Sequence, residues 1–481
     1  MAKKDNTWSI EISKFYQGAS PAMHLDSLTG IGNAGHYSVA SNIDILTPGL
    51  LTQGPALANL TAGTQAGAVT ELINFIMDKA VSDSVTYGIG ATKLFKITPS
   101  AVTSDATWPH AITNCTDGES VIDMGGSLYY FFNKSSGGEI GKFDLSSTFD
   151  DDWGSTVPTG AAALQKAIHP CYSKEDIIVF GNGQYAGTLI GTTLAPTKLD
   201  FGSGNEVADV IFSANQWLIV VNNGITGTNR TTGQVYTYDG GALSSILADE
   251  AGVGVQRIGF IYELNGIVYM AYQDLSSTGG YKIGYLAGRQ IKPLAYFTGS
   301  LPTFAQKTLY KHTILFLSSG SIYSAGAVID ELPFQLSQIA DGGYATCGAL
   351  ACPFGTPMVA STDGATNFRL AKFSGYDVSC SWKSIIFPVS GKYKGYVDDV
   401  TVFTNILGTN ARCDLTLECN QGVTTSNSKS ITGSGLTRHF FTAFGLNSIE
   451  DLRVALTWAS GSSANSADIK KILINGHYTE T

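Results

Sequence analysis

The chain has 481 residues, of which 43% are hydrophobic and 14% charged, and its formal net charge is −10. The charged fraction lies well below the roughly one quarter that is usual for a globular protein, and no basic run is longer than Lys3-Lys4. Because the first arginine is Arg230, a surface that neutralises phosphates by clustered basic residues is not expected. This argues against sequence-specific nucleic-acid binding.

The composition also indicates an all-β chain. Glycine is abundant, with 55 residues, and tyrosine and phenylalanine contribute 22 and 23. Many short strands joined by tight turns need such residues, whereas long helices would need more Glu, Lys, Ala and Leu. The sequence has no apolar run of about 18 residues and no signal-peptide pattern at its start, so we expect neither membrane insertion nor secretion.

The cysteines show no pattern of metal binding or of a disulfide framework. Their number is odd and no C-x-x-C pair occurs, so we expect small buried hydrophobic side chains. Cys413 and Cys419 are six residues apart on one expected strand. They should therefore face the same side but lie too far apart for a direct bridge. The seven cysteines are Cys115, Cys171, Cys347, Cys352, Cys380, Cys413 and Cys419.

Residues 1–65 show little hydrophobic periodicity and many turn-forming residues. Thr47-Pro48-Gly49 is a turn signal, because proline fixes φ and glycine admits positive φ. Gly54-Pro55 repeats this signal a few residues later. We expect this segment to be an N-terminal arm that docks on a neighbouring protein, or an entry strand, and not a domain of its own.

The clearest hairpin in the chain lies within residues 257–286. Two runs rich in aromatic and β-branched residues, 258–264 and 267–272, flank Asn265-Gly266. This dipeptide favours a tight type I′ turn, which needs positive φ at both central residues. A third apolar run follows at 281–286, so the segment predicts a three- to four-stranded antiparallel unit.

The same unit recurs along residues 66–378 at intervals of about 40–50 residues, the range of propellers and other repeat arrays. Seven units favour a β-propeller, because radial closure protects the edges of the sheets. Six blades are an alternative, since the first and third units are weakly patterned. An irregular stack of sheets or a β-solenoid is another. The seven hairpins begin near Ile73, Val121, His169, Asp209, Ile258, Thr308 and Cys347.

Residues 379–481 form longer and more regular strands. In 413–419, the apolar residues Cys, Leu, Leu and Cys alternate with Asp, Thr and Glu. Such alternation indicates one buried and one solvated face, so we expect a C-terminal β-sandwich of about 100 residues.

Candidate chemistry is sparse. Asp150-Asp151-Asp152 is the most acidic run, but a Ca²⁺ loop needs carboxylates at alternate positions. A solvated loop is therefore favoured, and metal binding stays open. The seven histidines lack metal-ligand spacing. For Trp108, Trp153 and Trp382, core packing is favoured over stacking on sugars.

A glycosidase built on a propeller is the enzyme alternative. Residues 361–368 loosely resemble the Asp-box turn of sialidases, with Asp363 in the run. Sialidase-like chemistry also needs an arginine cluster to clamp a carboxylate, and the early repeats hold no arginine before Arg230. We therefore expect no catalytic, cofactor-binding or metal-binding residues; hydrolysis lost on changing Asp363 or Asp150 would contradict this.

One short run resembles a known family. Asn42-Ile43-Asp44-Ile45-Leu46-Thr47-Pro48-Gly49-Leu50-Leu51, followed by Gly54-Pro55, is similar to the N-terminal region of tailed-bacteriophage virion proteins built on β-propellers. Tail nozzle and tail-tip proteins of this kind often have a D-x-x-T-P-G-x-L run and then a basic-Pro pair. This chain has Gln53-Gly54-Pro55 at that place. The resemblance implies a ring-forming structural role in the tail, near DNA passage or host contact, without catalytic residues.

We therefore expect a non-enzymatic structural component of a phage virion, located in the tail and synthesised in the host cytoplasm without a signal peptide. It would form a homo-oligomeric ring and contact other tail proteins through the N-terminal arm. It would serve tail assembly, DNA passage or attachment to a host-surface glycan or receptor. The alternatives are a carbohydrate-binding or glycan-cleaving propeller and a generic protein-interaction propeller.

Overall fold

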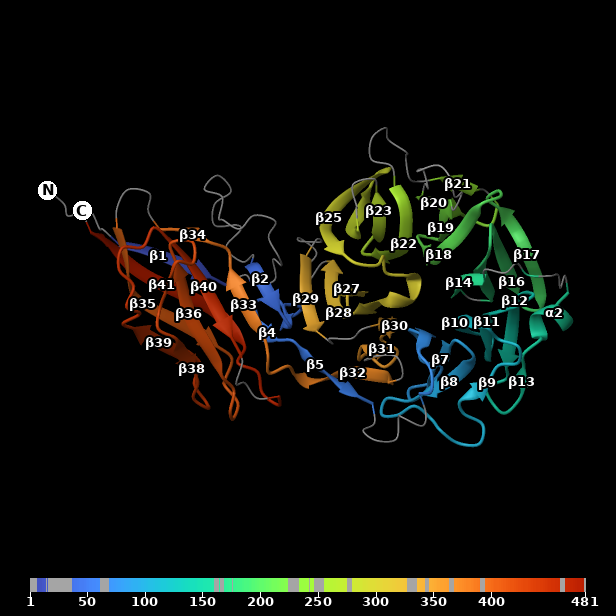
Figure 1. The fold of residues 1–481 in the computed structure, drawn as a ribbon, viewed down its shortest axis with the longest axis horizontal. Helices are drawn as coiled ribbons and strands as arrows, with labels where there is room; N and C mark the ends of the chain where they lie inside the picture. The colour runs from blue at the N-terminus through green and yellow to red at the C-terminus, as the bar shows by residue number, and fades with distance from the viewer. Residues whose placement is uncertain are drawn as a thin grey trace.

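The computed structural model consists almost entirely of β-strands (Figure 1). In the described residues, helical structure is limited to α2 (Trp153–Thr156), the 3-10 turn η3 (Phe304–Gln306) and a 3-10 residue at Phe15. The expected all-β class is confirmed. No helix in these residues has the length and apolar content needed to cross a membrane. The structure describes residues 7–13, 15, 37–60, 69–159, 164, 168–174, 176–223, 233–241, 243–245, 255–274, 279–326, 335–341, 346–362, 367–389, 394–458 and 463–479.

Seven four-stranded antiparallel sheets follow one another in the described part of residues 55–376. We number them sheets 1 to 7 in chain order. Sheet 1 contains β6 (Ile73–Ile76), β7 (Thr86–Gly90), β8 (Lys93–Ile97) and β9 (His110–Ala111); sheet 2 contains β10 (Asp117–Met124), β11 (Ser127–Lys134), β12 (Gly137–Phe143) and β13 (Phe149–Asp150); sheet 3 contains β14 (Ile168–Lys174), β15 (Ile177–Asn182), β16 (Tyr185–Ile190) and β17 (Thr193–Asp200).

The remaining four sheets have the same order, except that the outer strand of the last one comes from the N-terminal segment. Sheet 4 contains β18 (Asn205–Ser213), β19 (Gln216–Asn223), β20 (Gly233–Tyr238) and β21 (Leu243–Ser245); sheet 5 contains β22 (Val255–Leu264), β23 (Ile267–Asp274), β24 (Gly280–Ala287) and β25 (Gln290–Thr298); sheet 6 contains β26 (Lys307–Tyr310), β27 (Thr313–Ser318), β28 (Ser321–Gly326) and β29 (Gln335–Asp341); sheet 7 contains β30 (Thr346–Ala351), β31 (Met358–Thr362), β32 (Phe368–Tyr376) and β5 (Pro55–Asn59).

The predicted hairpin in sheet 5 has the expected turn. Asn265 and Gly266 have φ values of 53° and 77°, and β22 and β23 pair up to Leu264 and Ile267 on either side of them. Each of the seven expected hairpin starts falls within the first strand of one sheet. The outer strands of the sheets were not predicted, because several are short or irregular.

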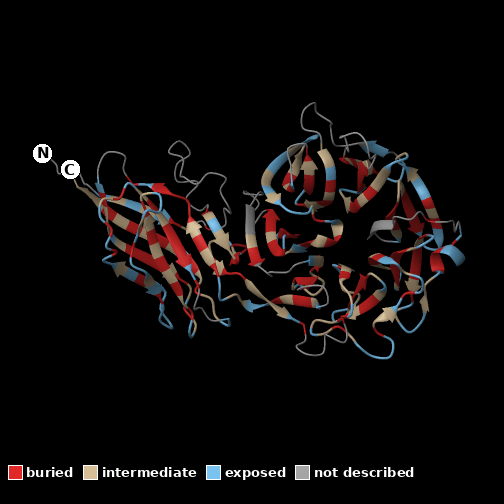
Figure 2. Ribbon diagram, viewed as in Figure 1, coloured by how far each residue is buried: buried red, intermediate tan, exposed pale blue. Residues whose placement is uncertain are grey.

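The seven sheets contact one another in sequence, and the last also contacts the first through β30 and β6. They therefore close a ring, with the first strand of each sheet facing the centre (Figure 1). A separate hydrophobic cluster fills the space between each pair of neighbouring sheets. In the cluster between sheets 7 and 1, for example, Met358 and Leu370 pack with Ile73 and Phe95. Inner strands such as β7, β27 and β31 are buried along their whole length, whereas the outer strand β25 is largely exposed; Figure 2 shows this distribution around the ring.

The C-terminal part forms two further antiparallel sheets, and both include strands from the N-terminal segment. The first has the order β1-β41-β35-β39, and the second has the order β2-β33-β40-β36-β37 with β34 and β38 at its sides. These strands are β1 (Thr7–Ile12), β2 (Tyr37–Ser41), β33 (Ser381–Ser384), β34 (Phe387–Pro388), β35 (Lys394–Thr404), β36 (Cys413–Cys419), β37 (Thr424–Thr425), β38 (Lys429–Ile431), β39 (Arg438–Thr442), β40 (Asp451–Thr457) and β41 (Ile469–Thr479).

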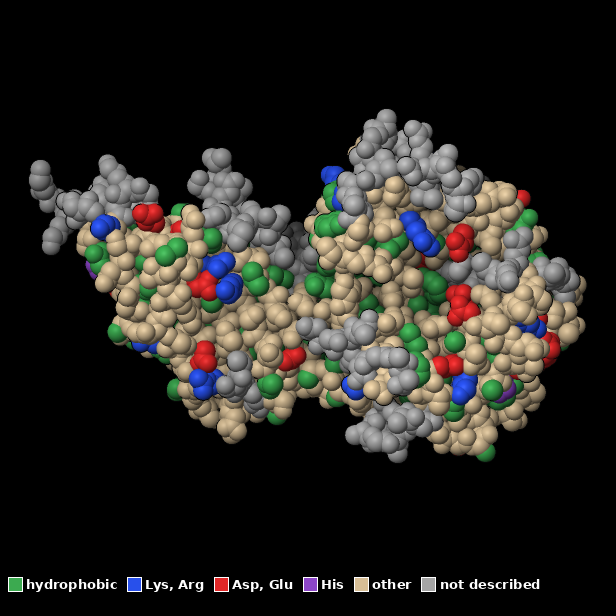
Figure 3. All heavy atoms as spheres, viewed as in Figure 1, with side chains coloured by type: hydrophobic (Ala, Val, Ile, Leu, Met, Phe, Trp, Pro, Cys, Tyr) green, Lys and Arg blue, Asp and Glu red, His purple; other side chains and the backbone are tan. Residues whose placement is uncertain are grey.

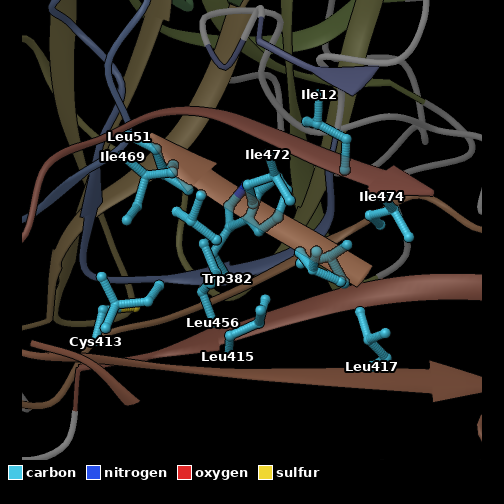
Figure 4. Packing of buried hydrophobic residues seen from close by; sticks show 14 of the residues in the cluster. Ile12, Leu51, Trp382, Cys413, Leu415, Leu417, Leu456, Ile469, Ile472 and Ile474 are labelled. Atoms are coloured by element: carbon cyan, nitrogen blue, oxygen red, sulfur yellow. The ribbon is translucent and has the colours of Figure 1, made fainter. Parts of the chain in front are cut away.

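One core lies between these two sheets (Figure 4). On β36, Cys413, Leu415, Leu417 and Cys419 are buried while the residues between them are partly exposed, as the alternation predicted. The two cysteines thus face the same side. Trp382 from β33 is fully buried beside them, next to side chains from β1 and β41.

The N-terminal segment was expected to be a docking arm or an entry strand. Its described strands pair within the chain: β1 with β41, β2 with β33, and β5 with β32. A short ribbon of β3 (Ile43–Asp44) and β4 (Thr52–Gln53) lies between them. The physical reason is edge protection, because β32 would otherwise expose a row of unpaired backbone groups.

Candidate functional site

A cavity of about 600 Å³ lies at the centre of the ring. Its walls come from the first strands of sheets 1, 2, 4, 5, 6 and 7 and from η3. In the face shown in Figure 3, charged side chains are sparse and hydrophobic ones gather around the middle of the ring. The charged side chains that line the cavity are Asp78, Lys79, Asp209, Glu263 and Lys307.

Asp209 and Lys307 form a buried ion pair across the cavity wall. Their side chains are 3% and 9% exposed. Asp209, in β18, also accepts hydrogen bonds from the backbone N–H of Val210 at 2.9 Å and of Ile261 at 2.8 Å. Lys307, at the start of β26, donates to Asp209 and to the carbonyl oxygen of Ile261. The pair therefore ties sheets 4, 5 and 6 together.

Two aromatic rings also lie close to the ammonium group of Lys307. Its ammonium lies 5.6 Å from the ring centre of Phe260 and 5.9 Å from that of Tyr262, and aromatic faces attract cations. Burial lowers the pKa of Lys307, while the carboxylate of Asp209 opposes this shift. A buried charge is tolerated only when it is paired and hydrogen-bonded, which is the condition that Asp209 fulfils.

Asp78 provides the second polar contact of the cavity wall. It follows β6 closely, and its Oδ1 accepts hydrogen bonds from the Thr308 hydroxyl at 2.6 Å and from the backbone N–H of Cys352 at 3.1 Å. These contacts connect sheet 1 to sheets 6 and 7. No hydrogen bond joins its Oδ2 to any residue that the structure describes.

Asp78 is accessible to solvent from the cavity, yet protein atoms surround it. The resulting desolvation raises the pKa of its carboxyl group to about 6; the hydrogen bonds from Thr308 and Cys352 and the charge of Lys307 oppose this shift. Asp78 therefore changes its charge near pH 6, whereas an aspartate without such surroundings does so near pH 4.

Aromatic side chains form the apolar part of the lining. Phe75 from β6 and Phe304 from η3 lie with their ring centres 5.8 Å apart, and both line the cavity together with Phe212 and Tyr262. The remaining carboxylate, Glu263, accepts a hydrogen bond from the backbone N–H of Gly266. Glu263 thereby stabilises the turn between β22 and β23.

The acidic run of residues 150–152 lies at the rim of the ring, and its three carboxylates diverge. Asp151 accepts from the Tyr130 hydroxyl at 2.5 Å and lies 3.1 Å from Nε2 of His110. Asp152 contacts Lys134 at 2.5 Å, and Asp150 accepts from the backbone N–H of Asp152. No group of three or more His, Cys, Asp or Glu side chains in the described ranges could hold a metal ion.

Asp151 is more deeply engaged than a solvated loop residue would be. Burial raises the pKa of its carboxyl group, but hydrogen bonds from His110, Tyr130 and Thr113 outweigh burial and hold the pKa below its usual range. The expected solvated loop is thus wrong for this residue, because its carboxylate stabilises the contact between sheets 1 and 2.

The three tryptophans for which the sequence left sugar stacking open are core residues. Trp108, Trp153 and Trp382 are 5%, 3% and 0% exposed, as expected for core packing. Asp363 of the sialidase-like run lies outside the described residues.

The run that resembles phage tail proteins lies between the ring and the C-terminal sheets. Asp44 Oδ1 accepts a hydrogen bond from the backbone N–H of Leu46 at 2.7 Å. A turn with Gly49 at φ 76° follows, and Leu51 then exchanges backbone hydrogen bonds with Ile469 of β41 at 2.9 Å. The run therefore joins the two parts of the molecule.

Sequence reasoning missed Asp78, Asp209 and Lys307 as a group. Asp209 and Lys307 each stand inside or beside an apolar strand, and a lone charge in such a run must find a partner when it is buried. That signal identifies the residues individually, but their meeting depends on closure of the ring.

No protein-family profile matches the chain, and no curated protein matches it. Among solved structures, the computationally designed Ika8 protein aligns with a TM-score of 0.41 and 13% identity, over 64% of this chain and 97% of that one. The AfRom2 CNH domain aligns with a TM-score of 0.41 and 10% identity, over 68% of this chain and 100% of that one.

An exo-β-1,3-galactanase from Phanerochaete chrysosporium aligns with a TM-score of 0.27 and 12% identity, over 74% of this chain and 95% of the enzyme. These scores and identities are too low to assign a function or an activity to this chain.

Proposed function

We propose that the chain is a non-enzymatic structural component of a tailed-bacteriophage virion, built on a seven-bladed β-propeller with a C-terminal β-sandwich. The succession of seven sheets and their closed order of contacts support the propeller. Closure by β5 also supports it, because joining the two ends of the repeat array in one sheet holds the ring shut.

The main support for a structural role is that the charged groups of the central cavity link the sheets and stabilise a turn. Asp209 and Lys307 neutralise each other while linking three sheets. Glu263 stabilises a turn, and one oxygen of Asp78 links sheet 1 to sheets 6 and 7. Charge at the centre of the ring therefore serves mainly to hold the ring together.

A glycan-cleaving enzyme would need a different arrangement. Glycosidases use two carboxyl groups on opposite sides of the scissile bond, one as acid and one as base or nucleophile. In the cavity, the Asp209 carboxylate is occupied by an ammonium group and two backbone N–H groups. The remaining carboxylate, Glu263, accepts a hydrogen bond at the turn between β22 and β23. These contacts favour the structural proposal over the enzymatic one.

The place in a virion tail rests on the resemblance of residues 42–55 to the N-terminal region of phage tail proteins. In this proposal the chain forms a homo-oligomeric ring that contacts other tail proteins and serves tail assembly, DNA passage or host contact. Because the described N-terminal strands are paired within the chain, partner contacts would form on surfaces outside these pairings.

Electron microscopy of the purified full chain tests the assembly that this proposal requires. We expect rings of uniform symmetry. A protein that stays monomeric at high concentration would contradict a ring-forming role. Hydrolysis of a polysaccharide panel that is lost in the Asp78→Asn or Asp150→Asn variant would instead support the enzyme alternative.

A further inference from the structure

The central cavity contains a carboxylate oxygen whose environment suits a ligand. Asp78 lines the cavity and is accessible from it. Both hydrogen bonds that the structure gives this side chain end on Oδ1, and Oδ2 has no hydrogen-bond partner in the described part of the chain. Because Asp78 is exposed to the cavity, a cation could contact this oxygen without breaking a contact within the protein.

The charge of the lining identifies the kind of ligand. Three carboxylates and two ammonium groups line the cavity, so the lining carries one excess negative charge when all five groups are ionised. Asp209 is neutralised by Lys307, and Glu263 is held at its own turn. Asp78 and Glu263 therefore share the remaining negative charge with Lys79 as the only other cation of the lining, and a single positive charge bound at Asp78 would balance the excess.

The apolar lining is consistent with an organic cation. Phe75 and Phe304 lie next to each other on the wall, and the faces of aromatic rings attract ammonium groups while their edges and bodies cover alkyl chains. A volume of about 600 Å³ is in the range of small-molecule sites. A hydrated inorganic cation would gain little from such walls.

We propose that the central cavity binds a small organic cation, with its ammonium group at Asp78 Oδ2 and its alkyl part against Phe75 and Phe304. This site is independent of the proposed virion role. The groups that face Asp78 also set its response to pH. They are Lys79, Asp209, Glu263, Lys307, Thr308 and Cys352.

The test compares n-butylammonium with n-butanol, which has the same chain but no charge, by ligand-observed NMR and calorimetry on the full chain at pH 7.5. We expect n-butylammonium to bind at least about tenfold more tightly, since one lost charge contact is worth that much or more. Acidification to pH 5 should weaken binding about tenfold, because the carboxyl group with a pKa of about 6 becomes mostly protonated.

Variants separate this site from general effects on the fold. Asp78→Asn keeps the Oδ1 acceptor and should lose binding of n-butylammonium, whereas Glu263→Gln, on the same wall, should keep it. Phe304→Leu should weaken it severalfold without changing the pH profile. Equal binding of n-butanol, unchanged binding by Asp78→Asn, or no binding of n-butylammonium at tens of millimolar would overturn the proposal.

Discussion

Ile45 and Leu46 are consecutive residues, yet their side chains lie in different hydrophobic cores. Ile45 is fully buried in the core between the two C-terminal sheets, and Leu46 is buried in the cluster between sheets 6 and 7 of the ring. The run that resembles phage tail proteins thus connects both parts of the molecule. Its Gly54 also leaves no room for a side chain, since an added Cβ would lie 2.2 Å from the carbonyl oxygen of Ile339.

Truncating these two residues should damage different parts of the molecule. Ile45→Ala and Leu46→Ala should each lower the free energy of unfolding by about 2–5 kcal/mol, the usual cost of a cavity in a core. Hydrogen exchange should show lost protection in β36 and β41 for Ile45→Ala, and in β27 and β31 for Leu46→Ala. The exposed Val423→Ala is the control, with a change within about 0.5 kcal/mol. Loss of hydrogen-exchange protection in the same strands for both variants would contradict the placement of Ile45 and Leu46 in two different cores.

Gly54→Ala tests the close approach between the N-terminal segment and sheet 6. The backbone oxygens of Ile339 and Asn42 would both contact the new methyl group, and backbone cannot move as a side-chain tip can. We expect destabilisation of about 3 kcal/mol or more, measured by urea unfolding. Gly241→Ala, where the nearest atom lies at 3.7 Å, should be nearly neutral; equal effects of the two substitutions would show that steric contact is not the cause.

Breaking the pair of Asp209 and Lys307 should be costly. Lys307→Met leaves the Asp209 carboxylate buried without its cation, which typically costs about 3–5 kcal/mol. The double variant Asp209→Asn with Lys307→Met should recover part of that loss, so a double-mutant cycle measures the coupling. Lys311→Met serves as the matched control, because Lys311 pairs with Asp44 near the surface and such pairs contribute about 1 kcal/mol or less. A coupling energy near zero would contradict the role of the pair.

Asp78 should give the protein a pH-dependent stability of defined sign. Its pKa is about 6 in the folded protein against 3.8 as the usual value, so between these values the folded state binds the proton more strongly than the unfolded state. Lowering the pH from 7 to 4 should therefore stabilise the wild-type chain relative to Asp78→Asn, by on the order of 1 kcal/mol because water in the cavity screens the charge. Thermal unfolding of both proteins across this range measures the difference, and the opposite sign would contradict the assigned pKa.

Much of the ring could be predicted from the sequence because hairpin turns and strand burial are encoded by residues that are close together in the chain. Asn265-Gly266 lies between two apolar runs, and this dipeptide favours a hairpin turn independently of residues elsewhere in the chain. The alternation in β36 likewise reports burial residue by residue. The N-terminal strands gave no such signal, since β1 pairs with β41 at the opposite end of the chain and no local pattern specifies so distant a partner.

The cavity could not be predicted for the same reason. Asp78, Asp209 and Lys307 come from three sheets and meet only when the ring closes. The single useful signal was the presence of isolated charges beside apolar strands. The acidic run at residues 150–152 suggested a site because its charges are consecutive. Asp150 ends β13, however, and Asp151 and Asp152 form the turn before α2, so the three carboxylates bind separate partners.

The most direct test of the proposed function is to locate this chain in virions. Phage particles purified from the host that produces the protein would be labelled with gold-coupled antibodies against the C-terminal sheets and imaged by electron microscopy. We predict gold particles at the tail and the chain as a component of the purified particles. A chain that is abundant in the lysate but missing from purified virions would contradict the account.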